Sequence, residues 1–196
     1  MKKHFSFICM IALTLWLGAC NNAADNAVEK ADSANDAKTD STDNKISATS
    51  TDESSADFMV KAANGGMMEV ELGKDAQQKA RSKEVKDFAE MMVRDHTTAG
   101  NELKALARQK NVTLPDTVSG NHRDHMMDIN KKTGNDFDKA YMDQMVDDHQ
   151  STVDMFKDVA DNCKDPEVKA WAAKTLPTLQ SHLDTAKAIA NRSVKK

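Results

Sequence analysis

The sequence predicts an all-α protein, and more narrowly an antiparallel four-helix bundle with a short extra helix in one connection. Four stretches of roughly 25 residues repeat apolar side chains at spacings of three and four, the pattern of one buried helical face. Strand signals are almost absent from the 196 residues. A short segment also occurs twice, at residues 91–107 and 144–160, which indicates two related helices.

Residues 1–19 have the features of a lipoprotein signal peptide. A basic start precedes an apolar run that is too short to span a bilayer. The run ends in LGAC at residues 17–20, which resembles the bacterial lipobox. The resemblance implies cleavage before Cys20 and a durable lipid anchor on it; the alternative is an ordinary secretory signal. Asn21 in place of Asp favours the outer membrane over the inner, so we expect a cell-envelope protein on the periplasmic face or cell surface.

Residues 20–55 are expected to form the lipidated Cys20 and a disordered acidic linker, with nascent helix around residues 23–37. Val28 and Ile46 are the only large aliphatic residues there, too few to offset the entropy of ordering. Residues 21–57 carry nine acidic and three basic side chains, whereas residues 58–196 carry 22 of each. No basic stripe is present, which argues against nucleic acid as a partner. The membrane, through Cys20, is the expected partner, and the sequence points to no protein partner.

The folded domain is predicted over residues 56–192, followed by a short tail at 193–196. Its four long helices are expected at about residues 55–79, 83–110, 136–161 and from 165 onward, with a short helix at about 119–132. The last long helix begins with Asp165-Pro166-Glu167, an N-cap, a proline at the first helical position and an acid in the first turn.

Three features break the local rules of these helices. Gly65 and Gly66 lie mid-helix, where each costs about 0.5–1 kcal/mol relative to Ala; they leave room for a ligand or let a neighbouring helix pack closely. Pro177 should kink the last helix. Ten of the twelve methionines lie in the domain, and thioethers either bind Cu(I) or fill a core.

Four polar residues lie on the apolar stripes, one on each long helix: Glu69, His96, His149 and His182. Counted from the predicted turns, they lie within one or two helical turns of the same height. One interpretation is a metal site, because imidazole and carboxylate are ligands for zinc, iron, manganese or copper. The other is a polar core network in which Glu69 is hydrogen-bonded to the histidines.

Two acidic residues, Asp95 and Asp148, directly precede His96 and His149 and are candidates for a second shell around the site. They lie about 100° round the helix from the histidines, so each is expected to face a neighbouring helix–helix seam. The remaining histidines of the domain, His122 and His125, and the lone Cys163 are expected to be solvated or packed locally.

Five motifs in order resemble a ferritin-like bacterial family described as "predicted outer membrane protein", domain of unknown function 4142. They are the Gly65-Gly66 pair before Glu69, MVRDH at 92–96, FDKAY at 137–141, MVDDH at 145–149 and LPTLQSHL at 176–183. The resemblance covers residues 56–192. It implies a ferritin-like antiparallel four-helix bundle in an exported protein and carries no established activity.

The sequence departs from the di-iron pattern of ferritin-like proteins. Di-iron members place Glu-x-x-His on two helices and Glu on the other two. Here Val93, Val146 and Leu179 stand three residues before the three histidines, so a single His-rich site is favoured over di-iron chemistry. No nucleophile–base set is present either. Two hypotheses follow: a tethered module that binds one metal ion or small ligand, and a structural or protein-interaction lipoprotein. Both rank above an enzyme.

Overall fold

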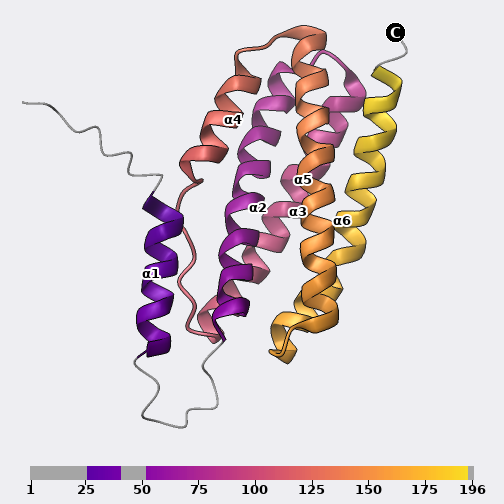
Figure 1. Ribbon diagram of the computed structural model, residues 1–196. Coiled ribbons are helices and arrows are strands. Elements are labelled where there is room, and N and C mark those ends of the chain that lie inside the picture. The colour runs from indigo at the N-terminus through magenta and orange to yellow at the C-terminus, as the bar shows by residue number, and fades with distance from the viewer. Residues whose placement is uncertain (1–25, 41–51, 194–196) are drawn as a thin grey trace, which may run out of the picture.

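The computed structural model describes residues 26–40 and 52–193, and these form six α-helices and no strand (Figure 1). The helices are α1 (Asn26–Asp40), α2 (Glu53–Lys79), α3 (Lys83–Gln109), α4 (Gly120–Asn130), α5 (Gly134–Asn162) and α6 (Pro166–Ser193). The all-α prediction is confirmed. The predicted signal peptide, Cys20 and the predicted tail beyond residue 193 lie outside the described residues. Among the described helices, none combines the length and apolar character that a membrane span requires.

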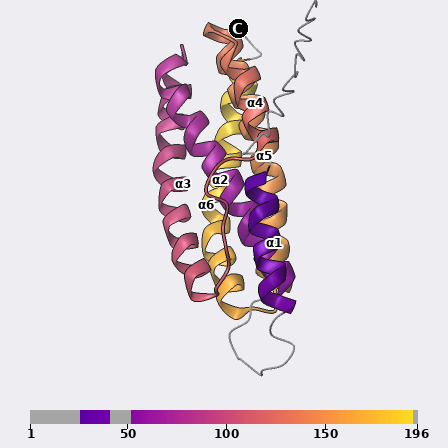
Figure 2. The same ribbon diagram turned by 90° about the vertical axis from the view of Figure 1, so that its left-hand side faces the viewer.

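Four long helices, α2, α3, α5 and α6, lie side by side (Figures 1 and 2). Helix α2 packs chiefly on α3, and α5 on α6; the two pairs meet through α2–α5 and α3–α6 contacts. Residues 80–82 and 163–165 form tight turns within each pair. The long connection through α4 carries the chain back along the outside, so α3 and α5 run in the same direction (Figure 1).

The helix ends follow local chemistry. Helix α2 begins after Asp52, whose carboxylate accepts a hydrogen bond from the Ser55 amide at 2.8 Å, two residues before the start expected from the sequence. Helix α3 ends where Asn111 adopts φ 56°, a left-handed conformation that asparagine tolerates. The Val112 amide then donates to the Ala107 carbonyl at 2.8 Å, which closes the last turn.

The core divides into two apolar clusters, one towards each end of the four long helices. The cluster around residues 80–82, here called the Met-rich half, contains Met68, Leu72, Val85, Phe88, Met92, Phe137, Tyr141, Met142 and Met145. The cluster around residues 163–165, here called the Trp171 half, contains Phe58, Met59, Leu103, Phe156, Trp171, Leu179 and Leu183. Six methionines are buried, which identifies them as core residues. The four predicted polar residues occupy the layer between the halves.

Residues 26–40 of the predicted linker form helix α1, which overlaps the nascent helix expected around residues 23–37 and, unlike a disordered segment, packs on the domain. It packs on α2 and buries Ala27 and Ala31 (Figure 2). Asn35 and Thr113 are joined by two hydrogen bonds: the Asn35 amide group donates to the Thr113 carbonyl at 3.0 Å, and the Thr113 amide donates to Asn35 Oδ1 at 2.7 Å. A helix that buries only alanine and asparagine carries little hydrophobic signal, which is why the sequence pattern does not predict its packing.

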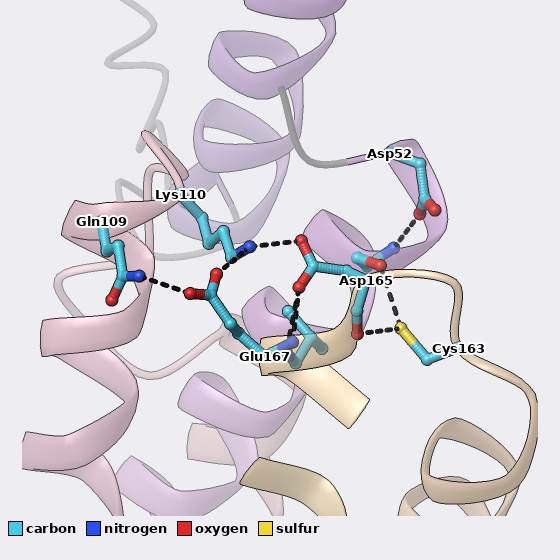
Figure 3. Close-up of polar contacts among 8 residues, drawn as sticks. Asp52, Gln109, Lys110, Cys163, Asp165 and Glu167 are labelled. Atoms are coloured by element: carbon cyan, nitrogen blue, oxygen red, sulfur yellow. Dashed lines mark hydrogen bonds and ion pairs between the residues drawn. The ribbon is translucent and has the colours of Figure 1, made fainter. Parts of the chain in front are cut away.

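Polar contacts join the helix ends around residues 163–165 (Figure 3). Lys110, just after α3, forms ion pairs with Asp165 at 2.7 Å and with Glu167. Asp165 also caps α6, because its Oδ1 accepts from the Glu167 and Val168 amides, as the sequence predicts. These contacts tie α3 to the start of α6 at this end of the molecule. Helix α6 continues through Pro177 without interruption.

Candidate metal centre

The structure brings together the four polar residues that the sequence places at one height. Glu69 comes from α2, His96 from α3, His149 from α5 and His182 from α6, and each is at most 8% exposed. The three imidazole centroids lie 5.3–5.5 Å apart in every pairing. The convergence predicted from helix lengths therefore holds in the folded chain.

Glu69 holds the first of these histidines through a buried contact. His96 Nδ1 lies 2.9 Å from Glu69 Oε2 and donates a hydrogen bond to it. The second carboxylate oxygen lies 3.5 Å from His149 Nδ1. That His149 nitrogen has a closer partner, the Met145 carbonyl at 2.9 Å, one helical turn earlier on α5. The sequence analysis does not predict Met145 as a partner of His149. The spacing of four residues, one helical turn, is the feature that could have predicted this contact with a backbone carbonyl.

Asp95 orients the third histidine from a neighbouring helix. His182 Nε2 donates to Asp95 Oδ2 at 3.0 Å, across the seam between α3 and α6. Arg94 in turn donates from Nε to Asp95 Oδ1 at 2.7 Å. Asp95 thus faces a helix seam, as its angular position predicts, and contacts a histidine other than its sequence neighbour.

The charges in this layer follow from burial and pairing. Burial alone would raise the pKa of Glu69, but His96 and His149 outweigh it and lower that pKa to about 2. Burial likewise opposes protonation of His96, yet Glu69 raises the pKa of His96 overall. Burial lowers the pKa of His149, and it lowers that of His182 to about 4. Glu69 is therefore anionic at neutral pH, while His149 and His182 are neutral and keep a lone pair for a ligand.

Each histidine has one nitrogen engaged and one without a partner. The unpartnered nitrogens of the three rings are His96 Nε2, His149 Nε2 and His182 Nδ1, all buried; Tyr141 Oη, Asp148 Oδ2 and Trp171 Nε1 are the other buried side-chain atoms without a partner among the described residues. The three side chains each offer one ligand atom, and these atoms lie within 4.8 Å of one another. Zinc–nitrogen bonds of about 2.0–2.1 Å need nitrogens about 3.3 Å apart in a tetrahedral site, so the rings would draw together on binding.

This arrangement divides the predicted site residues into two groups. The histidines can act as ligands, whereas Glu69 and Asp95 occupy the opposite ring nitrogens of His96 and His182. Metal-binding histidines typically donate their other N–H to a carboxylate or a backbone carbonyl, which fixes the ring and its tautomer. Glu69 lies where an orienting carboxylate would lie, with one oxygen 2.9 Å from His96 Nδ1; its role as a ligand stays a prediction.

The other sequence-predicted residues lie away from the three histidines. Asp148 Oδ1 accepts from Gln144 at 2.9 Å, and burial raises the pKa of Asp148 to about 6. Within the described part of the chain, Asp148 forms no hydrogen bond with His96, His149 or His182. His122 pairs with Asn64 at 3.1 Å, His125 is exposed, and the Cys163 thiol lies 3.2 Å from the Ser55 hydroxyl (Figure 3).

Comparison with known proteins places the chain among proteins of related fold. Two solved structures resemble it. A DUF305 fragment from Deinococcus radiodurans matches 73% of this chain and 99% of its own, with 13% identity and a TM-score of 0.65. CopM in its Cu(II)-bound form matches 70% of this chain and 96% of its own, with 19% identity and a TM-score of 0.60. At these identities the likeness shows the fold alone.

No curated protein matches the sequence. The family model of the domain of unknown function DUF4142 matches residues 23–189, a range that takes in all but the last few residues of the six helices. It agrees with the resemblance carried by the five sequence motifs. The chain belongs to the DUF4142 family.

Proposed function

We propose that this protein is a cell-envelope lipoprotein whose helical domain binds one transition-metal ion through His96, His149 and His182. The observation that carries the proposal is the pairing pattern of the rings: each histidine has one nitrogen held by an acceptor and one buried nitrogen without a partner. A buried ring nitrogen with no partner is costly. A metal ion would satisfy all three at once.

Nitrogen ligands favour Cu(II) or Zn(II) over manganese, which prefers oxygen donors. Affinity for nitrogen sites rises towards copper in the divalent series, and a structure of similar fold, CopM, was solved with Cu(II) bound. Three protein ligands also leave a fourth position open, as in zinc sites with an exchangeable ligand. The anionic Glu69 and Asp95 would offset part of the charge of a divalent ion.

The fold and the address belong to the same proposal. One long connection, between α3 and α5, supports a ferritin-like arrangement, in which a single crossover joins two helical hairpins. The LGAC motif at residues 17–20 supports a lipid anchor on Cys20 in the outer membrane. Cys20→Ala would then move the protein from the membrane fraction to the soluble fraction, and mass spectrometry of the parent would show acyl groups on Cys20.

The test of metal binding is elemental analysis of protein purified without chelator or nickel resin, followed by titration with Cu(II) and Zn(II). We expect close to one ion per chain. The triple variant His96→Ala, His149→Ala, His182→Ala should bind none, whereas His125→Ala, which removes an exposed histidine, should bind as the parent does. Nitrogen hyperfine splitting in the Cu(II) spectrum should require the three buried histidines.

Glu69→Gln separates a metal site from a polar core. It keeps the volume of the side chain and removes the charge that orients His96, so metal affinity should fall about 10- to 100-fold, as for other changes to groups that hydrogen-bond a metal ligand. A parent that takes up no metal and gains no thermal stability from either ion would overturn the proposal. The layer would then be a structural hydrogen-bond network, and the triple variant would lower only the melting temperature.

A further inference from the structure

A cavity of about 310 Å³ opens between α2 and α3 in the Trp171 half. Residues of α2, α3, α5 and α6 line it, together with Leu114 and Pro115 of the connection between α3 and α4. Its inner end reaches Glu69 and His96, on the edge of the polar layer. The volume lies within the range of small-molecule sites, which is about 300–1,000 Å³.

Small residues keep this space open. Gly65 on α2 and Gly100 on α3 both line the cavity, and a Cβ added at either would meet no atom within 4 Å. Close packing between helices therefore does not explain these two glycines. Each lies within a long helix, where glycine costs about 0.5–1 kcal/mol relative to alanine. At both positions this cost coincides with open space in the cavity.

The lining has an apolar interior and a basic rim. Leu103, Phe156, Trp171 and Leu179 belong to the apolar cluster of this half and contribute to the lining. Lys61, Lys74 and Lys104 lie at the exposed edge, where Glu71 is the one exposed acid of the lining. The charge of Glu69 is engaged by His96 inside the bundle. An apolar pocket with a cationic rim is complementary to a molecule with an apolar body and an anionic head.

We propose that this cavity binds a small amphipathic organic anion, with its apolar body against Leu103, Phe156 and Trp171 and its anionic head near the lysines. Of the three proposed metal ligands only His96 lines the cavity, and binding of the anion does not require the proposed metal. It uses the open space that Gly65 and Gly100 create. A free medium-chain carboxylate, for which octanoate is the probe, has this chemistry.

Trp171 makes the proposal testable in the full chain. The sequence has two tryptophans, Trp16 and Trp171. Cleavage before Cys20 would remove Trp16, and Trp16→Phe removes it from any unprocessed chain, so Trp171 is the only tryptophan observed. Octanoate added to the chelator-treated protein should shift Trp171 emission and saturate at one molecule per chain. Octanol and octylammonium have the same apolar body without the anionic head, and they should bind at least tenfold more weakly.

Two variants separate filling of the cavity from general damage. Gly100→Leu should weaken octanoate binding at least tenfold, while Ala105→Leu, an exposed position on the same helix outside the cavity, should leave it unchanged. Thermal unfolding verifies that both are folded. The double variant Lys61→Gln, Lys104→Gln should weaken octanoate and leave octanol unaffected. Equal octanoate binding by Gly100→Leu and the parent would overturn the proposal. Equal affinities for octanoate, octanol and octylammonium would also overturn it. So would a protein that binds phosphatidylglycerol vesicles but no free octanoate.

Discussion

The seam between α2 and α3 differs on the two sides of the histidine layer. In the Met-rich half, a Cβ on Gly73 would lie 2.9 Å from Val93 Cγ2 and 3.4 Å from the Ala89 carbonyl oxygen. In the Trp171 half, a Cβ on Gly65 or Gly100 would meet nothing within 4 Å. The same residue type thus permits close contact at one end of the seam and open space at the other. The atoms that neighbour a mid-helix glycine therefore decide whether it permits close helix packing or leaves open space.

The largest expected difference between the halves is in the free energy of unfolding that is lost when a buried leucine is changed to alanine. Leu72 in the Met-rich half and Leu103 in the Trp171 half are both buried from solvent, but Leu103 also lines the cavity. Leu72→Ala should lower the free energy of unfolding by about 3–5 kcal/mol, because it leaves a new void in a close-packed core. Leu103→Ala should cost about 2–3 kcal/mol, since it enlarges an existing cavity. Denaturant unfolding measures both, and equal costs would contradict the division into a packed and an open half.

Gly73→Ala tests the close contact directly. The added methyl group overlaps Val93, so the free energy of unfolding should fall by about 1–3 kcal/mol despite the gain in helix propensity. Val93→Ala removes the atom in conflict. The double variant should therefore be more stable than the sum of the two single changes predicts, which a double-mutant cycle detects. Strict additivity would show that the seam is not tightly packed at Gly73.

Asp165 stabilises the outer end of the Trp171 half through its ion pair with Lys110 and its cap on α6. Burial would raise the pKa of Asp165, but hydrogen bonds from Lys110 and from the Val168 and Glu167 amides lower it overall. A lowered carboxyl pKa contributes stability above the unfolded value, about 3.9, and this contribution is lost as the pH falls through the folded value. The parent should therefore lose stability in acid partly through this residue.

The Asp165 variants separate the ion pair from the helix cap. Asp165→Ala removes both and should cost about 1–2 kcal/mol at pH 7. Asp165→Asn keeps a capping side chain and loses the ion pair with Lys110, so it should cost less. Both variants should show a smaller loss of stability than the parent between pH 5 and pH 2 in urea-unfolding experiments. An unchanged acid dependence would assign the effect to other carboxylates.

The sequence predicts the helices of residues 52–193 closely because each carries a strong apolar period and clear end signals. Asp165-Pro166-Glu167, for example, marks the start of α6 within one residue. The convergence of Glu69 with three histidines is predictable too, since helix rise converts residue counts into heights. Side-chain partners are not: whether Asp95 contacts His96 or His182 depends on how α3 and α6 pack.

Helix α1 and the cavity escape the same reasoning for two different physical reasons. The buried face of α1 consists of Ala27, Ala31 and Asn35, so its docking rests on small contacts and the hydrogen bonds to Thr113. The cavity is an absence of side-chain volume at Gly65 and Gly100. A one-dimensional pattern cannot distinguish that absence from a close helix crossing, as Gly73 demonstrates.

The smallest expected effects are gains at the open glycines. Gly65→Ala and Gly100→Ala should each raise the free energy of unfolding by about 0.5–1 kcal/mol, because alanine lowers the entropy cost of the helix and meets no neighbour. Thermal and denaturant unfolding of the single and double variants measure the gain. If Gly65→Ala and Gly100→Ala raise the free energy of unfolding while Gly73→Ala lowers it, the glycines that line the cavity destabilise the fold and the glycine of the packed half stabilises it. A lower free energy of unfolding for Gly65→Ala or Gly100→Ala would instead mean that α2 and α3 lie closer together in solution than in this structure. The cavity would then be closed in solution.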